Sequence, residues 1–240
     1  MKIHLNTMEE YEKYARSMFT RIRIAMEAGC SVDEVEVLMS PEVQLEVLRR
    51  QEKSMEEDRK MRAESLRSNW GAPARHAERI VAFSKGWSDA QRSLLNILGT
   101  GLFVGLVGGR GTGKTQLAVE LMRETTERQK SALFCSAMQF FIEVKATYGE
   151  GSKTREGAVI QKYQFTSLLV IDEMGKRGNS DWENNLLFEL INRRYNDRMD
   201  TILIDNRTKA EFIETIGPSL ASRMNECGGI VECNWESFRK

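Results

Sequence analysis

Residues 102–115 read LFVGLVGGRGTGKT, an apolar run that leads into a glycine-rich turn and ends on a lysine and a threonine. A helical pattern, residues 116–129, follows directly. The turn has the spacing GxxxxGKT between a strand and a helix, which is the setting of a phosphate-binding P-loop. Glycines let backbone N–H groups converge on an anion, and the helix N-terminus adds its partial positive charge at the same point. The stretch therefore predicts an α/β fold built around an anion site.

The residues of this turn have separate expected roles in holding ATP and Mg²⁺. The backbone that would wrap the phosphates belongs to Gly108, Gly109, Arg110, Gly111, Thr112 and Gly113. Lys114 would bring a mobile positive charge to the β- and γ-phosphates, and the Thr115 hydroxyl would ligate Mg²⁺. ATP and Mg²⁺ are therefore the expected ligands.

A second motif supplies the acids that such a site needs. Residues 168–173 read LLVIDE, four apolar residues followed by two carboxylates. A buried strand in an open α/β sheet delivers its last side chains to the edge where ligands bind. Asp172 is expected to hold Mg²⁺, and Glu173 to act as the general base that polarises the attacking water.

Two further positions have weaker support from spacing alone. The run TILI, residues 201–204, ends at Asp205 and Asn206, and a neutral amide at Asn206 would orient the water or reach the γ-phosphate. Asp205 competes for that role. Arg223 lies in the helical pattern LASRM, where it is either a surface ion-pair residue or an arginine that stabilises phosphoryl charge on a neighbouring subunit.

The rest of residues 69–240 alternates apolar runs with amphipathic stretches. Further runs fall at 132–135 and 230–233, and residues 182–195 form another helical pattern. Short, continuously apolar strands separated by helices indicate a parallel sheet covered on both faces. The segment NWGAP, residues 69–73, reads as a loop and a domain boundary.

The first 68 residues are expected to form a small helical N-terminal domain and a linker helix. Capping boxes at Thr7 with Glu10 and at Ser31 with Glu34, a proline at position 41, and a small core of Tyr11, Met18, Ile22 and Ile24 support this expectation. Residues 42–68 are rich in charges at i,i+4 spacing, which predicts one long exposed helix.

Composition limits the classes of function. Lys plus Arg and Asp plus Glu each number 35, so a general electrostatic grip on nucleic acid is not expected, and any such contact needs a local patch. The N-terminus lacks the apolar run of a signal peptide and no stretch is long and apolar enough to span a membrane, so we expect a cytoplasmic protein without a membrane partner. The four cysteines have no CxxC spacing and read as free thiols.

Taken in order, these motifs resemble the DnaC-type helicase loaders, AAA+ ATPases of the DnaC/IstB-like family. The resemblance rests on GGRGTGKT, LLVIDE, TILIDN, the SRM helix, the terminal NWESFR and the upstream Gly71-x-Pro73-x-Arg75, and it covers residues 69–240. IstB-type transposition helper ATPases share most of this pattern. Trp235 before Glu236 favours the loaders.

The resemblance implies a five-stranded parallel sheet in the order 5-1-4-3-2 without a C-terminal lid. It places Asn206 at the sensor position and Arg223 at the arginine finger, so that a homo-oligomer would complete each ATP site. It also implies a loader that binds single-stranded DNA and delivers a replicative helicase, which the N-terminal domain would grip. Candidate DNA contacts are Lys153, Arg155, Lys176 and Arg177, each of which fits a solvated surface residue equally well. Tyr148 and Trp182 are candidates for stacking on bases, although packing in the core or on the surface is favoured for both.

Three alternatives remain at this point. A transposition helper would act on duplex DNA. A small-molecule kinase is a P-loop protein too, but Glu173 directly after Asp172 suits the activation of water. A binding module with a silent ATP site is disfavoured by the intact set of Lys114, Thr115 and the two acids.

Overall fold

The computed structural model describes residues 20–23, 27, 29, 41–76, 84–148, 155–178 and 180–238. The chain divides into two units, Met1–Arg59 and Lys60–Lys240. Several expected features lie outside the described residues: the capping boxes at Thr7 and Ser31, the core residues Tyr11, Met18 and Ile24, and the candidate DNA contact Lys153.

A five-stranded parallel sheet is the centre of the second unit. Its strands are β1 (Phe103–Val107), β2 (Ala132–Ser136), β3 (Leu168–Asp172), β4 (Asp200–Ile204) and β5 (Gly228–Glu232). They lie in the order β2-β3-β4-β1-β5, and all four pairings are parallel. The expected order 5-1-4-3-2 is thus confirmed. Strands β1 to β4 match apolar runs because both faces of the sheet are covered there, whereas β5 lies at the edge and is only partly buried.

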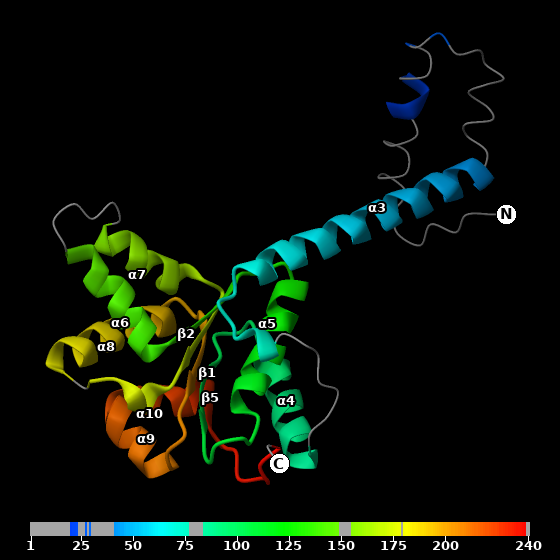
Figure 1. Cartoon of the computed structure of the whole chain (residues 1–240). Helices are drawn as coiled ribbons and strands as arrows, with labels where there is room; N and C mark the ends of the chain where they lie inside the picture. The colour runs from blue at the N-terminus through cyan, green and yellow to red at the C-terminus, as the bar shows by residue number, and fades with distance from the viewer. Residues whose placement is uncertain are drawn as a thin grey trace. The chain divides into compact units, whose positions relative to one another are not determined.

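Helices cover the two faces unequally (Figure 1). One face packs against α4 (Lys85–Ile97) and α5 (Lys114–Glu127), with Val104 and Leu106 of β1 in that core. The other face packs against α6 (Ala137–Lys145), α7 (Glu156–Phe165), α8 (Asp181–Asn196), α9 (Lys209–Ile216) and α10 (Pro218–Cys227). Short 3-10 turns η1 (Ala74–His76), η2 (Ala146–Tyr148) and η3 (Met174–Lys176) lie between these elements. The helical patterns expected at residues 116–129 and 182–195 are α5 and α8.

Side-chain caps start several helices immediately after the strands. The hydroxyl of Ser136, the last residue of β2, accepts from Gln139 N and begins α6. Thr208, four residues after β4, forms a capping box with Glu211 and begins α9. Such caps satisfy backbone N–H groups that have no intrahelical acceptor. They keep the loops at the carboxyl edge of the sheet short, and this edge carries the site.

Helix α3 (Pro41–Ser68) confirms the long helix expected from the charge pattern and begins at the predicted proline. Within the second unit its last turns bury Ala63, and Arg67 pairs with Glu127 at 3.0 Å. The chain then runs along the open edge of β2, where Trp70 O accepts from Phe134 N at 2.6 Å. Gly71 has φ +71°, and a Cβ there would lie 2.6 Å from Phe134 O. The expected boundary loop is therefore packed tightly on the sheet.

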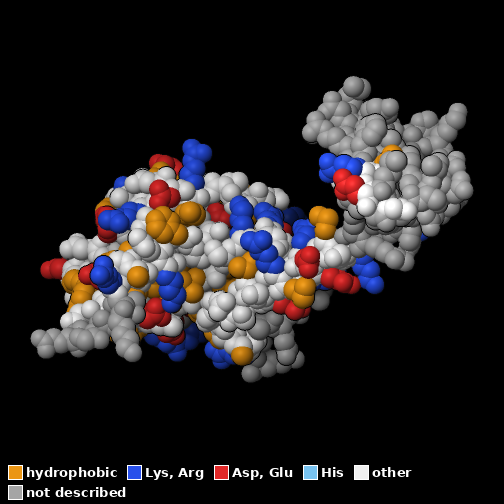
Figure 2. All heavy atoms as spheres, turned by 90° about the horizontal axis from the view of Figure 1, so that it is seen from above, with side chains coloured by type: hydrophobic (Ala, Val, Ile, Leu, Met, Phe, Trp, Pro, Cys, Tyr) orange, Lys and Arg blue, Asp and Glu red, His pale blue; other side chains and the backbone are white. Residues whose placement is uncertain are grey.

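Surface charges are mixed in sign. Figure 2 shows basic and acidic side chains interspersed over one face of the molecule, in keeping with equal numbers of the two in the sequence. Among the described residues no helix has the length and apolar character needed to span a membrane.

A buried arginine and an aspartate fasten the amino edge of the sheet. Arg194 of α8 is fully buried and donates hydrogen bonds to backbone carbonyls of Tyr163, Gln164, Thr166 and Asp200 and to the Thr201 hydroxyl. The Asp200 carboxylate accepts from the backbone N–H groups of Gly99, Gly101 and Leu102 at 2.6–3.1 Å. These bonds join the ends of α4 and α7 to the start of β4, so the amino edge is fixed by charge-assisted bonds.

We expect Arg194→Met to lower the free energy of unfolding by about 3–5 kcal/mol, because several buried carbonyls lose their donor at once. Urea denaturation followed by circular dichroism measures this loss. The neighbouring Arg193→Met is the matched control: Arg193 is half exposed and forms an ion pair with Glu189, so its loss should cost less than about 1 kcal/mol. Equal stability of the two variants would contradict this role of Arg194.

Candidate functional site

The glycine-rich turn links β1 to α5 at the carboxyl edge of the sheet. Gly108, Gly111 and Gly113 have φ of +123°, +83° and +79°, a region that favours glycine. The α5 helix begins at Lys114, directly after Gly113. The turn therefore has the glycine conformations and the helix N-terminus that the sequence predicts for an anion cradle.

Lys114 is buried, and its ammonium lies against the turn itself. Its Nζ donates to the carbonyls of Gly108 at 2.7 Å and Gly109 at 2.6 Å, and lies 3.4 Å from Thr112 Oγ1. These partners are neutral oxygens. A phosphate oxygen carries a full negative charge and forms a stronger bond with an ammonium. A phosphate bound in the turn would therefore compete with these carbonyls for the Lys114 ammonium.

Thr115 and Asp172 join the two sequence motifs. The Thr115 hydroxyl donates to Asp172 Oδ2 at 2.9 Å, and the other carboxylate oxygen, Oδ1, accepts from Glu173 N at 2.6 Å. Burial raises the pKa of the Asp172 carboxyl, and the nearby Glu173 charge adds to the rise, whereas the two hydrogen bonds and Lys114 oppose it. Burial thus disfavours the charged form of this carboxyl group, and a cation bound beside it would favour that form.

Glu173 has a left-handed backbone, with φ 59° and ψ 39°. This conformation is uncommon for residues other than glycine, and strained backbone of this kind concentrates at functional sites. Its carboxylate Oε1 forms an ion pair with Lys176, three residues on in η3. Sequence reasoning did not single out this partner of the expected base.

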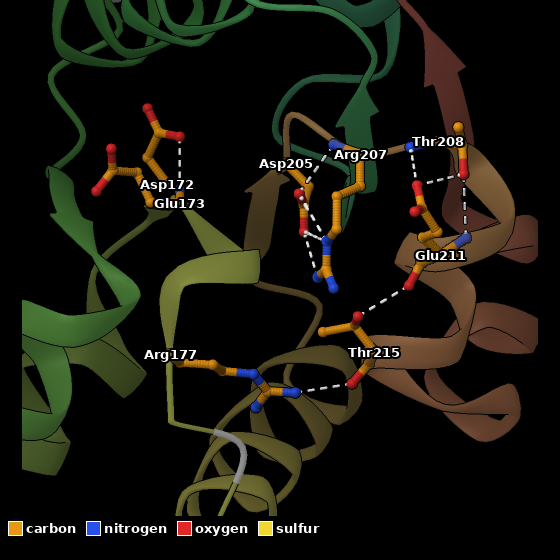
Figure 3. A network of polar contacts seen from close by, with 8 residues as sticks. All are labelled: Asp172, Glu173, Arg177, Asp205, Arg207, Thr208, Glu211 and Thr215. Carbon is orange, nitrogen blue, oxygen red and sulfur yellow. Dashed lines mark hydrogen bonds and ion pairs between the residues drawn. The ribbon is translucent and has the colours of Figure 1, made fainter.

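Asp205 and Asn206 have different surroundings, and Figure 3 shows Asp205 with its partner Arg207. Asp205 is buried, and its carboxylate accepts from Arg207 Nη2 at 2.7 Å, from Nε at 3.2 Å and from the Arg207 backbone N–H. Asn206 is exposed and lines the pocket described next. Asp205 is thus paired with Arg207, whereas Asn206 is among the residues that line the pocket.

A pocket of about 630 Å³ brings the expected site residues together. It is lined by Arg110, Gly111, Gly113, Lys114, Thr115, Asp172, Glu173 and Asn206, as expected from the sequence. It is also lined by Gly71, Pro73, Arg75, His76, Gln116, Phe134, Ser136, Gln139, Lys176 and Phe238. The pocket thus lies across the ends of β3, β4 and β1, at the edge where open α/β sheets bind ligands.

The segment 71–76 is attached to α5 beside this pocket. His76 Nδ1 lies 3.0 Å from Gln116 Oε1, and Gln116 Nε2 donates to Glu120 Oε1 at 3.1 Å. The sequence marks Gly71 and Pro73 as part of a boundary loop, and only the family resemblance groups them with Arg75. Their spacing alone gives no reason to place them at the site, since the contact depends on the course of the chain after α3.

The residues present fit a triphosphate with Mg²⁺. Three glycines at positive φ allow the backbone conformation of the turn, and a buried ammonium and a helix N-terminus lie at the same place. A hydroxyl and a carboxylate oxygen 2.9 Å apart are hard oxygen donors of the type that Mg²⁺ takes, together with substrate phosphates.

Arg223 does not line the pocket. It lies on α10, where its guanidinium donates to Asn192 Oδ1 and lies 5.7 Å and 5.3 Å from the ring centroids of Phe188 and Tyr195. Within its own chain this arginine is engaged with α8 rather than with the site residues.

One expected DNA contact is wrong. Arg177 is buried and donates to Thr215 O at 2.7 Å (Figure 3), so its side chain is not available at the surface. Arg155 and Lys176 are exposed. Trp182 packs against Phe141 and Tyr148, with Lys145 Nζ over its ring at 5.0 Å.

The sheet order, the P-loop after β1 and the acid pair after β3 define a P-loop nucleoside triphosphatase fold of the AAA+ class. Residues 21–240 match the family model described as IstB-like ATP binding protein, and the chain belongs to this family. The replicative helicase loader DnaC of Escherichia coli K12 is 29% identical over 133 residues, which are 55% of this chain and 54% of DnaC. An insertion sequence IS21 putative ATP-binding protein from Pseudomonas aeruginosa is 29% identical over 112 residues, 47% of this chain and 41% of that protein. The match thus spans about half the length of these relatives.

Solved structures support the fold. The crystal structure of the DnaC helicase loader superposes with a TM-score of 0.56 at 21% identity, over 67% of this chain and 99% of that one. The replication initiator DnaA bound to AMPPCP and single-stranded DNA gives 0.57 at 20% identity, over 69% and 52%. DnaI gives 0.54 at 16% identity, over 68% and 95%.

We expect Asp172→Asn to raise the midpoint of thermal unfolding of the nucleotide-free protein by a few degrees, because it removes a charge held in a buried place. The amide retains both hydrogen bonds, accepting from Glu173 N and donating to the Thr115 hydroxyl. The same variant should lose most of the further stabilisation that Mg²⁺ with ATP gives the wild type. Differential scanning fluorimetry with and without Mg-ATP measures both effects. A variant less stable than the wild type without nucleotide would contradict the first.

Proposed function

We propose that this protein is an ATP-dependent helicase loader that binds and hydrolyses ATP with Mg²⁺, binds single-stranded DNA and delivers a replicative helicase. The observation that carries the proposal is the convergence of Lys114, Thr115, Asp172, Glu173 and Asn206 on one pocket. The fold shared with DnaC and the sequence match to DnaC over 133 residues support the loader function. Acting on DNA, the protein would work in the cytoplasm.

In the proposed hydrolysis, each residue of the expected ATP site has a role. The backbone of Gly108, Gly109, Arg110, Gly111, Thr112 and Gly113 binds the phosphates, and Lys114 neutralises charge on the β- and γ-phosphates. Thr115 and Asp172 hold Mg²⁺, which when bound supplies positive charge at the phosphate oxygens. Asn206 orients the attacking water by hydrogen bonding.

Glu173 accepts the proton of the attacking water. Its Oε1 pairs with Lys176 in the structure, so water competes with that ammonium for the same carboxylate. Glu173 is only partly buried, and Lys176 is exposed on a short 3-10 turn. Separation of the pair therefore needs rotation of a surface lysine and no rearrangement of the sheet.

Arg223 serves the ATP site of a neighbouring protomer. It is absent from the lining of its own pocket, and its guanidinium is held between two rings and an amide at the surface of α8. A preorganised arginine stabilises charge on the transferred phosphoryl group without reorganisation at the moment of reaction. The active species in this proposal is a homo-oligomer.

The proposal gives separate tasks to the two domains expected from the sequence. Residues 1–68 form the partner-binding domain and linker helix, which grip the helicase, and residues 69–240 form the ATPase domain, which contacts DNA. Arg155 and Lys176 are exposed basic residues at loops beside the site and are the remaining candidates for contacts with phosphate.

A transposition helper that acts on duplex DNA is the second candidate. It is favoured by the family description and by the match to the IS21 protein at the same 29% identity as DnaC. The two candidates share the ATP chemistry and differ in the nucleic acid and in the protein partner.

We expect Glu173→Gln to bind ATP within about twofold of the wild type while hydrolysis falls by about 100-fold or more, because the amide cannot accept the proton. Calorimetric titration gives the affinity and phosphate release gives the rate. Lys114→Ala is the contrasting variant, in which ATP binding itself is lost. Hydrolysis by Glu173→Gln at the wild-type rate would remove Glu173 from its role.

The ATP-trapped Glu173→Gln protein then separates the two candidate functions. Fluorescence anisotropy compares a labelled single strand with the matching duplex at one stated salt concentration, since such affinities depend steeply on salt. A preference for the single strand, with recovery of a hexameric helicase by the full-length chain, supports the loader. A preference for the duplex supports the transposition helper and overturns the loader.

We expect Arg223→Ala to lower ATP hydrolysis by about 1000-fold while ATP affinity of the monomer stays unchanged, since the side chain acts on another subunit. Arg193→Ala, on the exposed side of α8, is the control. Mixing Arg223→Ala with Lys114→Ala should restore activity, because each Lys114→Ala subunit supplies an intact arginine to its neighbour. Absence of rescue at concentrations where the wild type assembles would contradict action across an interface.

A further inference from the structure

The outer side of the P-loop is held by hydrogen bonds from two remote parts of the chain. Gly111 O accepts from Phe238 N at 2.9 Å, and Thr112 O accepts from the indole Nε1 of Trp235 at 2.6 Å. Gly113 O accepts from the indole Nε1 of Trp87 at 3.2 Å. Three successive carbonyls of the loop thus each have a donor from α4 or from the segment after β5.

These hydrogen bonds to the carbonyls also fix the direction of the N–H group on the other side of each peptide. In a trans peptide the C=O of one residue and the N–H of the next point in opposite directions, and no described peptide bond is cis. Carbonyls 111, 112 and 113 held outward therefore direct the N–H groups of Thr112, Gly113 and Lys114 toward the inner side of the loop. Those N–H groups are the ones that cradle phosphates in a P-loop.

Close packing shows that the indoles are fitted to this place. A Cβ on Gly113 would lie 3.1 Å from Trp87 Nε1 and 3.2 Å from a Phe238 ring carbon. A Cβ on Gly86 would lie 3.0 Å from a Trp235 ring carbon. Glycine at both positions therefore allows each aromatic ring to lie close to the backbone.

The strand register brings the C-terminal segment to the loop. Val107 pairs with Glu232, and Cys233 N then donates to Val107 O at 2.8 Å. A Cβ on Gly108 would lie 3.0 Å from Cys233 O, so the segments that follow β1 and β5 lie side by side at the loop. Trp235 follows two residues later. Trp87 reaches the same loop from the first turn of α4, where it is fully buried.

We propose that Trp87 and Trp235 are positioning residues for triphosphate binding, whose indole N–H groups hold the P-loop peptides with their own N–H groups directed at the phosphates. This inference rests on the proposed function, because it assigns a role toward the same ATP site. Loss of the Trp235 indole N–H leaves Thr112 O without its donor and lets that peptide rotate. Gly113 O also accepts from Leu117 N at 2.8 Å, so loss of the Trp87 indole N–H removes one of its two donors and loosens the peptide less. Affinity for the nucleotide then falls because part of the binding energy is used to order the loop.

A tryptophan-to-phenylalanine series tests the proposal, since it keeps an aromatic ring and removes the N–H. Trp87→Phe and Trp235→Phe each remove a donor to the loop. Trp70→Phe is the matched control: Trp70 is buried in the same apolar cluster as Trp87, but its indole nitrogen has no hydrogen-bond partner among the described residues. The readouts are the dissociation constants of ATP and ADP by calorimetric titration in Mg²⁺, and the midpoint of thermal unfolding without nucleotide.

We expect Trp235→Phe to weaken ATP binding by about 3- to 10-fold, the change that loss of about 0.7–1.4 kcal/mol produces. Trp87→Phe should weaken it in the same direction by a smaller factor, because Gly113 O keeps the bond from Leu117 N. ADP should lose affinity by the same factor, because the loop N–H groups contact the α- and β-phosphates. Trp70→Phe should bind both nucleotides as the wild type does. The maximal rate of hydrolysis at saturating ATP should be unchanged in the two loop variants, so that only KM rises.

Affinities of both loop variants within twofold of Trp70→Phe would overturn the proposal and leave the indole bonds as fold contacts only. The same conclusion follows if affinity falls only in proportion to a loss of thermal stability. If Trp87→Phe does not fold, Trp235→Phe decides alone, because Trp235 is only partly buried. Failure of the wild type to bind ATP would instead refute the proposed function, so the two failures are distinguishable.

Discussion

The hydrogen bond between the Thr115 hydroxyl and Asp172 Oδ2 joins the two halves of the site, and it depends on the parallel sheet. Asp172 is the last residue of β3, and Thr115 lies in the first turn of α5, which begins after the loop at the carboxyl end of β1. Strand β4 lies between β1 and β3, so Asn206 emerges between the P-loop and the acids. A different strand order would separate the phosphate-binding turn from the carboxylates.

The two edges of the sheet differ in their physical character. At the amino edge, Arg194 and Asp200 are buried and their hydrogen-bonding groups have backbone partners. At the carboxyl edge, burial raises the pKa of the Asp172 carboxyl, and Glu173 has a left-handed backbone. The stability of one edge offsets the strain of the other, which is the usual relation between a scaffold and a functional site.

Much of this arrangement was predictable from local patterns. Apolar runs gave every strand to within two residues, because strands buried on both faces need continuous apolar sequence. The P-loop and the acid pair followed from residue type and spacing. The strand order came from the family resemblance rather than from periodicity, since apolar runs do not specify their neighbours. Arg177 was misplaced because a basic residue in a loop near a site reads as exposed, whereas its donor reaches Thr215 O of α9.

The sequence by itself determined that a strand, a glycine turn and a helix form a phosphate cradle, because each depends on residues adjacent in the chain. It also determined that two carboxylates follow another buried strand. Only the tertiary structure decided that Asp205 is taken by Arg207 while Asn206 faces the pocket, that Lys176 pairs with Glu173, and that Trp87 and Trp235 hold the P-loop from outside. The tryptophan contacts and the position of Asn206 depend on the packing of separate elements, whose distances and directions are not encoded in local spacing. The pairs Glu173–Lys176 and Asp205–Arg207 lie within three residues of each other and depend on the backbone conformation that their loops adopt in the fold.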